Sequence, residues 1–141
     1  TKHHINVFGE ELIIENAEDA LKKAALKHDV DIVDYTVGPI FMDGKDKGAH
    51  EWIIEFKKAP KSIEEFRQSL DDNLRAVNSD YDAKRDRDTT LKMLNMHSAK
   101  KGLFYTWLKN NEKLGGQHKI PRLSNQRKYI EELLNLQQKM S

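Results

Sequence analysis

The spacing of apolar residues changes several times along this chain, and each change predicts a different element. Residues 5–8 form a short, mostly apolar stretch that ends at Gly9, a pattern typical of a strand followed by a turn. Residues 17–26 then place Ala and Leu on one helical face, and Asn16 before them is a favourable N-cap residue. The chain therefore opens with a predicted strand and a predicted helix.

Two alternating segments separated by a polar loop predict a β-hairpin. Residues 30–41 show the period of two that a strand requires. The two faces of this strand carry Ile32, Asp34 and Thr36 on one side and Val33, Tyr35 and Val37 on the other. Residues 43–48 contain two glycines and form the expected hairpin loop. The returning strand alternates Trp52, Ile54 and Phe56 with Glu51, Ile53 and Glu55.

The next predicted helix has a clear start signal. Ser62 and Glu65 form a capping-box pattern, in which the serine oxygen caps a backbone N–H and the glutamate reaches back. Apolar residues then recur every three or four positions, at Ile63, Phe66, Leu70, Leu74 and Val77. Beyond this helix we expect a charged loop at residues 80–88 and a mixed strand at residues 91–97.

Two shorter helices complete the predicted order. The first is centred on Phe104, Trp107 and Leu108, and the second follows Ser124 as its N-cap. The order is then β-α-β-β-α-β with two extra C-terminal helices, which corresponds to the split β-α-β motif. We therefore expect an α+β domain with a small, mostly antiparallel sheet, split β-α-β packing and helices on the faces. This fold class does not by itself indicate a function.

Composition narrows the class of protein. The chain has 141 residues, of which 33% are charged and 38% hydrophobic, which suits one well-solvated globular domain. It has no cysteine, which excludes disulfides and thiolate chemistry, and its apolar runs are too short to span a bilayer. Because no signal-peptide pattern opens the sequence, a cytoplasmic location fits best.

Charge is unevenly distributed between the two halves of the chain. Residues 1–80 hold 11 Lys/Arg and 17 Asp/Glu, whereas residues 81–141 hold 13 and 6. The basic second half favours an anionic partner, such as a nucleotide phosphate, a nucleic acid or an acidic protein surface. An equally good interpretation is that the two halves neutralise one another within the fold.

Candidate chemistry is concentrated in residues 115–122. Two adjacent glycines allow the backbone to approach a ligand, and a proline stiffens the run that follows. Lys119 and Arg122 could hold a phosphate or a carboxylate, with Gln117 and His118 close by. The spacing is not that of a Walker A loop, so an ordinary basic loop before a helix is the alternative.

The histidines and the aromatic residues argue against two further kinds of site. The six histidines are scattered, with no paired spacing and no neighbouring cysteine, so we expect no metal site. The aromatic residues Trp52, Tyr105 and Trp107 suit a core better than a base-stacking surface. We therefore expect neither a nucleic acid nor a membrane as a partner.

Several segments together resemble the C-terminal region of the auxin-responsive acyl acid–amido synthetases, an acyl-adenylate-forming family of the luciferase-like superfamily. Residues 32–36, IVDYT, are similar to its Val-Val-Glu/Asp-Tyr-Thr strand, and residues 48–56, GAHEWIIEF, to its Gly-His-Tyr-Val-x-Phe-Trp-Glu strand. Residues 117–122, QHKIPR, resemble the more specific Gln-Tyr/Phe-Lys-Val/Met-Pro-Arg signature. Residues 8–12, FGEEL, resemble the hinge that opens the lid in the wider superfamily.

The resemblance implies roles for the residues of the basic loop. Lys119 would be the catalytic lysine, which stabilises the charge that gathers on phosphate during adenylation. Gln117, His118 and Arg122 would bind the nucleotide or orient the loop. His118 stands where the family usually has an aromatic ring, which leaves the identity of both substrates open.

The resemblance also implies an organisation into a hinge and a lid. Residues 1–12 would hold the hinge and a short strand, and residues 13–141 a single C-terminal lid domain of a larger enzyme. Phe8, Gly9 and Glu10 would absorb the rotation that opens the site for amide formation.

What such a lid would work with follows from the same resemblance. It would act with an N-terminal adenylation domain of the same chain, on a small carboxylic acid and an amino acid. ATP and Mg²⁺ would serve the full-length ligase, while this domain would bind neither alone and would be inactive by itself. Two other functions stay open, a free-standing α+β module that binds a ligand or a protein, and a nucleic-acid-binding domain.

Overall fold

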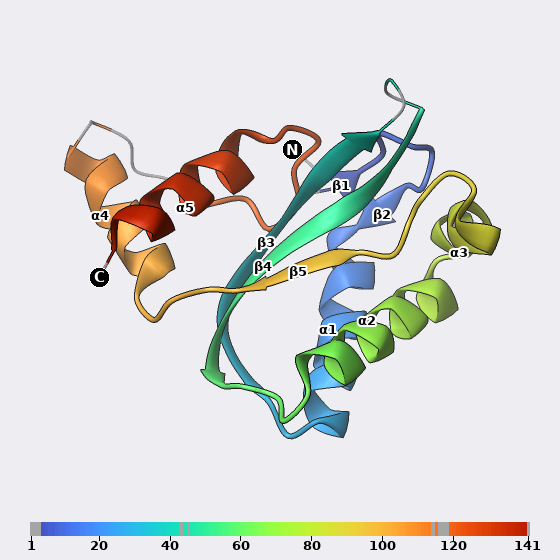
Figure 1. Ribbon diagram of the computed structural model, residues 1–141, viewed down its shortest axis with the longest axis horizontal. Coiled ribbons are helices and arrows are strands. Elements are labelled where there is room, and N and C mark those ends of the chain that lie inside the picture. Colours follow the sequence, from blue (N-terminus) through green and yellow to red (C-terminus); the bar gives the residue numbers. More distant parts are fainter. Residues whose placement is uncertain (1–3, 43, 45, 114, 116–118, 141) are drawn as a thin grey trace.

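The fold places a three-stranded sheet between two pairs of helices. The computed structural model describes residues 4–42, 44, 46–113, 115 and 119–140. One pair of helices, α1 and α2, covers one face of the sheet, and α4 and α5 lie on the other side (Figure 1). This arrangement confirms the predicted α+β class.

The N-terminal segment forms a small sheet of its own. Strands β1 (His4–Ile5) and β2 (Leu12–Ile13) pair antiparallel, and both contribute a fully buried side chain to the main core. The strand predicted at residues 5–8 is therefore shorter than expected and lies outside the three-stranded sheet. The chain instead turns after Ile5 and returns to β2, which brings two apolar side chains inward from one tight turn.

Helix α1 (Ile14–Lys27) begins two residues before the predicted N-cap. The side chain of Asn16 accepts a hydrogen bond from the backbone N of Ile13 (3.1 Å), so Asn16 bonds the N–H of the N-cap residue from inside the helix. The buried residues of α1 are Ala17, Ala20, Leu21 and Ala24. They follow the predicted apolar face except at its end, where Leu26 is exposed.

The main sheet has the strand order β3-β4-β5. Strands β3 (Asp31–Met42) and β4 (Lys47–Lys58) form the predicted antiparallel hairpin, of whose loop Asp43 and Lys45 lie outside the described residues. Strand β5 (Asn95–Ser98) runs parallel to β4 and forms its other edge. Helix α2 (Ile63–Val77) connects these two parallel neighbours, so no strand separates them as one would in a split arrangement.

Strand β3 does not alternate evenly, because it contains a bulge at Val33. Ile32 pairs with Phe56 and Asp34 pairs with Glu55, so one extra residue lies between the two pairs. Ile32 consequently packs on the same core as Tyr35, and the prediction that it shares a face with Asp34 is wrong. The bulge turns both Val33 and Asp34 toward the opposite side of the sheet.

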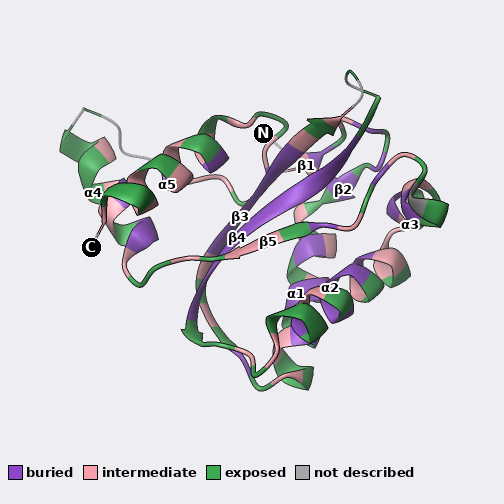
Figure 2. Cartoon of the chain, viewed as in Figure 1, coloured by how far each residue is buried: buried purple, intermediate pink, exposed green. Residues whose placement is uncertain are grey.

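Two hydrophobic cores lie on the two faces of the sheet (Figure 2). The larger one joins α1 and α2 to β3 and β4 through residues such as Trp52, Ile54, Phe56, Phe66 and Leu70. The smaller one joins Ile53 to α4 (Leu103–Lys113) and α5 (Lys128–Lys139). Strand β4 is buried between them along most of its length, since it faces helices on both sides.

The charged segment at residues 80–88 is helical, which the sequence did not predict. It forms α3 (Ser79–Arg85) and a 3₁₀ turn η1 (Asp86–Asp88), with the Asn78 side chain capping α3 at Tyr81 N (2.7 Å). Arg85 is buried because Asp71 of α2 binds its guanidinium at two positions. The ion pair between Arg85 and Asp71 therefore explains why this charged segment is helical and packed against the fold.

Two predicted helix caps have different outcomes. Ser62 caps α2 as expected, since its Oγ accepts from the backbone N of Glu65 (3.2 Å). Ser124 does not cap α5, which begins four residues later at Lys128; its Oγ accepts from Gln126 N (3.1 Å) in the preceding turn. None of the helices formed by the described residues combines the length and the apolar character needed to cross a bilayer.

Candidate functional site

The basic loop lies along the outer edge of β3. The backbone N of Val37 donates to Arg122 O (2.8 Å), and Ser124 N donates to Val37 O (3.1 Å). The Thr36 hydroxyl donates to Pro121 O (2.7 Å). These bonds extend the sheet by a short parallel bridge, which places residues 119–122 beside the bulged part of β3.

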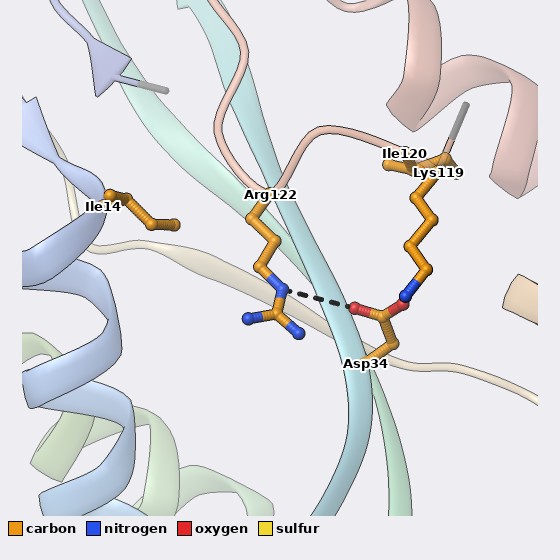
Figure 3. A pocket seen from close by; sticks show the side chains of 5 residues that line it. All are labelled: Ile14, Asp34, Lys119, Ile120 and Arg122. Atoms are coloured by element: carbon orange, nitrogen blue, oxygen red, sulfur yellow. Dashed lines mark ion pairs between the residues drawn. The ribbon is translucent and has the colours of Figure 1, made fainter. Parts of the chain in front are cut away.

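The loop and the strand enclose a pocket of about 280 Å³. Ile14, Asp34, Lys119, Ile120 and Arg122 line it, and Figure 3 shows Lys119 and Arg122 extending toward Asp34. Two of the predicted site residues, Lys119 and Arg122, are therefore brought together at one opening. Gln117 and His118 lie outside the described residues.

Arg122 is held by three groups of the protein. Its Nη1 donates to Glu18 Oε1 (2.9 Å), and its Nε lies 3.6 Å from Asp34 Oδ1. The guanidinium carbon lies 5.1 Å from the ring centroid of Tyr35, within the range of a cation–π contact. Both carboxylates and the ring belong to elements of the larger core, so Arg122 ties the basic loop to that part of the fold.

Tyr35 connects the surface ion pair to the interior. Its ring stacks on Trp52 at 5.5 Å, and its hydroxyl donates to Glu18 Oε2. Burial, together with this hydrogen bond to Glu18, raises the pKa of Tyr35 well above its usual value. The phenol therefore stays protonated and keeps donating to the carboxylate at any physiological pH.

Lys119 differs from Arg122 in having no such partners. Its side chain is exposed, and within the described part of the chain it has neither a hydrogen bond nor an ion pair. A free ammonium at the rim of a pocket can move to an incoming anion without first breaking an internal bond. The arrangement thus combines one anchored cation with one available cation.

The predicted hinge residues are tightly packed on both sides of Gly9. Phe8 is buried against Phe41 (ring centroids 5.8 Å apart). Glu10 is fully buried, and its carboxylate accepts from Phe8 N (2.8 Å) and His50 Nε2 (2.6 Å). Gly9 itself is exposed and has φ 82°, a left-handed conformation that favours glycine.

The N-terminal turn before the hinge is bonded to the chain just after the basic loop. Asn6 N donates to Asn125 Oδ1 (2.8 Å), and Asn125 Nδ2 donates to His4 O (3.3 Å). The N-terminal turn is thereby bonded to the chain that follows Arg122. Nothing in the sequence spacing indicated this contact, because it joins residues more than 100 positions apart.

A separate polar cluster joins the sheet to the start of α5. Glu51 of β4 is buried and binds His97 Nε2 (2.6 Å) and Arg127 Nη1 (2.8 Å). The hydrogen bond from His97 lowers the pKa of Glu51, burial opposes this shift, and Arg127 adds to it. Across the described residues, no group of three His, Asp or Glu side chains is arranged to hold a metal ion.

Sequence reasoning missed the partners of Arg122. Glu18 was not singled out at all, and Asp34 appeared only as part of a strand motif. The motif IVDYT did contain both Asp34 and Tyr35, so their proximity to each other was visible. Their contact with Arg122 was not, because it depends on the bulge and on the return of residues 121–124 along β3.

Comparisons with known proteins agree with this architecture. The GH3 family C-terminal domain matches residues 15–128. The structure of GH3.15 acyl acid amido synthetase has a TM-score of 0.71 at 22% identity, covering 99% of this chain and 26% of that one. AtGH3.15 acyl acid amido synthetase in complex with 2,4-DB has a TM-score of 0.72 at 19% identity, covering 96% and 26%.

This chain spans about a quarter of the length of those two structures. No curated protein sequence matches it. The family match covers most of the chain, including the hairpin, the bulge at Val33 and the loop that carries Lys119 and Arg122. The resemblance inferred from the motifs is thus confirmed, and the chain belongs to the GH3 family as a C-terminal domain of that family.

Proposed function

We propose that this domain is the lid of an ATP-dependent acid–amino acid amido synthetase, in which Lys119 stabilises the charge formed during adenylation. The free ammonium of Lys119 at the rim of the pocket is the observation that carries the proposal. The family membership supports a partner domain in the same chain. Its acid and amino acid substrates are proposed from the acyl acid amido synthetases that share the fold.

The chemistry explains why a mobile cation is needed. In adenylation a carboxylate oxygen bonds to the α-phosphorus of ATP, and the bond to pyrophosphate breaks. Negative charge gathers on the phosphate oxygens as this happens, and a cation placed there contributes about 3–4 kcal/mol. Mg²⁺, held with ATP by the adenylation domain, would supply the remaining charge neutralisation.

The two cations of the loop have different parts in this proposal. Lys119 extends toward Asp34 in this structure and would turn toward the phosphate in the full-length protein, because no bond within the described residues holds its ammonium (Figure 3). Arg122 keeps the loop against β3 through Glu18 and Asp34. Asp34 faces Lys119 across the same pocket, so the lysine can rest near a carboxylate when no phosphate is present (Figure 3).

The hinge would allow the second half-reaction, amide formation, to follow adenylation. Gly9 can change its backbone angles at low cost, while Glu10 stays fixed to the domain by burial and its bond to His50. Phe8, on the other side of Gly9, would have to leave its contact with Phe41 as the domain rotates. Rotation about this point would remove Lys119 after adenylation and expose the adenylate to an amino group. Under this proposal the domain works in the cytoplasm and is inactive when separated from its adenylation domain.

Two half-reactions measured separately in the full-length protein test the proposal. We expect Lys119→Ala to lower the rate of acid-dependent adenylation about 100–1,000-fold, with little change in KM for ATP. Amide formation from a pre-made adenylate should stay near the normal rate. Lys23→Ala is the matched control, since Lys23 is an exposed lysine paired with Asp19 on α1 (2.9 Å). Normal adenylation by Lys119→Ala would refute the assignment and favour a binding module.

A further inference from the structure

The side chain of Arg122 is committed to the protein before any ligand arrives. Its Nη1 and Nε face two different carboxylates, those of Glu18 and Asp34, at 2.9 and 3.6 Å. An arginine that binds phosphate uses the same fork of N–H groups for the ligand. In this domain the fork is directed at carboxylates of α1 and β3, and Lys119 extends toward the second of these, Asp34 (Figure 3).

Glu18 is an unusual residue for the exposed side of a helix, because both of its oxygens are engaged. Oε1 accepts from Arg122 Nη1 (2.9 Å), and Oε2 accepts from the hydroxyl of Tyr35. Tyr35 in turn is fixed by its stacking on the buried Trp52. The carboxylate therefore occupies a defined position although the side chain is 46% exposed.

The Glu18–Arg122 contact adds a side-chain anchor to a loop whose backbone is bonded to β3. Backbone and side-chain bonds secure Pro121 to Ser124 along β3. Lys119 and Ile120 make no such bonds within the described residues, so Lys119 projects from the last point at which the chain is held. A shift of Arg122 would move that point, and with it Lys119, which lies three residues earlier in the chain.

From these contacts we propose that Glu18 is a positioning residue for adenylation: it orients Lys119 through Arg122. This inference rests on the proposed function of Lys119. Glu18 lies on α1, which is separated from the last hinge residue, Glu10, by only three residues. The pair Glu18–Arg122 thus joins the lysine loop to the first rigid element beyond the hinge, so that hinge rotation moves both together.

The test compares Glu18→Gln with Glu15→Gln in the full-length protein. Both residues are on α1, and Glu15 is exposed with no bonded partner in the described part of the chain. We expect Glu18→Gln to slow adenylation about 10–50-fold, because a displacement near 1 Å of a charged group can cost up to about 100-fold. Glu18→Gln should leave unchanged the KM for ATP, the rate of amide formation from a pre-made adenylate and the Tm (within about 2 °C). Glu15→Gln should behave as wild type.

A double-mutant cycle distinguishes positioning from direct phosphate binding. If Glu18 acts through Arg122, then Arg122→Gln and the double variant Glu18→Gln/Arg122→Gln should lose the same adenylation rate as Glu18→Gln alone. Modification of Arg122 by phenylglyoxal should also be faster in Glu18→Gln than in Glu15→Gln. This second measurement does not require catalysis.

Three results would overturn the inference. Adenylation by Glu18→Gln within twofold of wild type, while Lys119→Ala still loses about 100-fold, would refute positioning and leave the proposed function intact. A tenfold rise in KM for ATP in Arg122→Gln alone would make Arg122 a phosphate ligand. Normal adenylation by Lys119→Ala would remove the proposed function, and the inference with it.

Discussion

Arg85 and Arg122 both bind carboxylates, but their surroundings differ. Arg85 is 7% exposed, and Asp71 binds its Nε (2.9 Å) and Nη2 (2.8 Å) from a side chain that is itself buried. Arg122 has a side chain that is 44% exposed and binds two carboxylates from separate elements, one of them at 3.6 Å. The first pair joins α2 to α3 within the interior, and the second joins a loop to the sheet at the surface.

The difference in burial implies that the two arginines contribute differently to stability and to function. A buried ion pair cannot lose one partner without leaving an uncompensated charge inside the protein. An exposed pair is solvated and contributes little to the free energy of unfolding, so its geometry can serve another purpose. We infer that Arg85 maintains the fold and that Arg122 directs the loop that carries Lys119.

The largest expected effect is on the buried pair. Arg85→Leu should lower the free energy of unfolding by about 3–5 kcal/mol, because Asp71 would remain buried without its partner. Arg75→Leu is the matched control: Arg75 pairs with Asp82 nearer the surface (2.6 Å), and its loss should cost less than about 1 kcal/mol. Urea unfolding followed by circular dichroism measures both. Similar losses in the two variants would remove the distinction between buried and exposed arginines.

The predicted hinge contains both a buried residue, Glu10, and an exposed one, Gly9, so we expect a change there to have an intermediate effect on stability. Gly9→Ala should cost about 1–2 kcal/mol of stability, because φ 82° is unfavourable for a residue with a Cβ atom. In the full-length protein it should slow amide formation more than adenylation, since rotation precedes only the second step. Equal slowing of both half-reactions would show that Gly9 is only a turn residue.

The stability of the fold should depend on pH through the buried carboxylate of Glu51. The pKa of Glu51 is lowered in the folded state, mainly by the hydrogen bond from His97. Its stabilising contribution is therefore present above the unfolded-state pKa of about 4.3 and is lost as pH falls through the lower folded-state value. Between about pH 5 and pH 3, wild type should lose about 1 kcal/mol more stability than Glu51→Gln. Parallel pH profiles would contradict this, and thermal melts at each pH provide the measurement.

The smallest effect should be on the surface pair. Arg122→Lys should change the free energy of unfolding by less than about 1 kcal/mol, because the exposed pair is screened by solvent. Adenylation should nevertheless fall, since an ammonium cannot reproduce the contacts of the guanidinium with Glu18, Asp34 and Tyr35. A loss above about 2 kcal/mol would place Arg122 in the same class as Arg85.

Much of the fold could be predicted from short-range patterns. The helix at Ile63–Val77 begins where the serine cap indicated, and the hairpin of β3 and β4 follows the alternating segments. One helical segment could not be predicted, because it depends on a contact with another helix. The 3₁₀ turn and α3 were hidden by a charge run whose key residue, Arg85, is buried only because Asp71 binds it.

The candidate site was predicted in part. Lys119 and Arg122 were identified from residue type and motif, and the structure brings both to one pocket. The resemblance implied different roles for the two cations, but the sequence could not show that Arg122 has bonded partners and that Lys119 has none among the described residues. Gln117 and His118 remain predictions.

The sequence alone determined the elements that depend on neighbours within a few positions, and it determined the family through its motifs. Periodicity, caps and turns act over three or four residues, so they can be inferred without a structure. Only the tertiary structure decided that Glu18 meets Arg122 across 104 positions and that a bulge turns Asp34 toward Lys119. Such contacts depend on the path of the whole chain, since side chains far apart in sequence meet only after the sheet and its helices have packed.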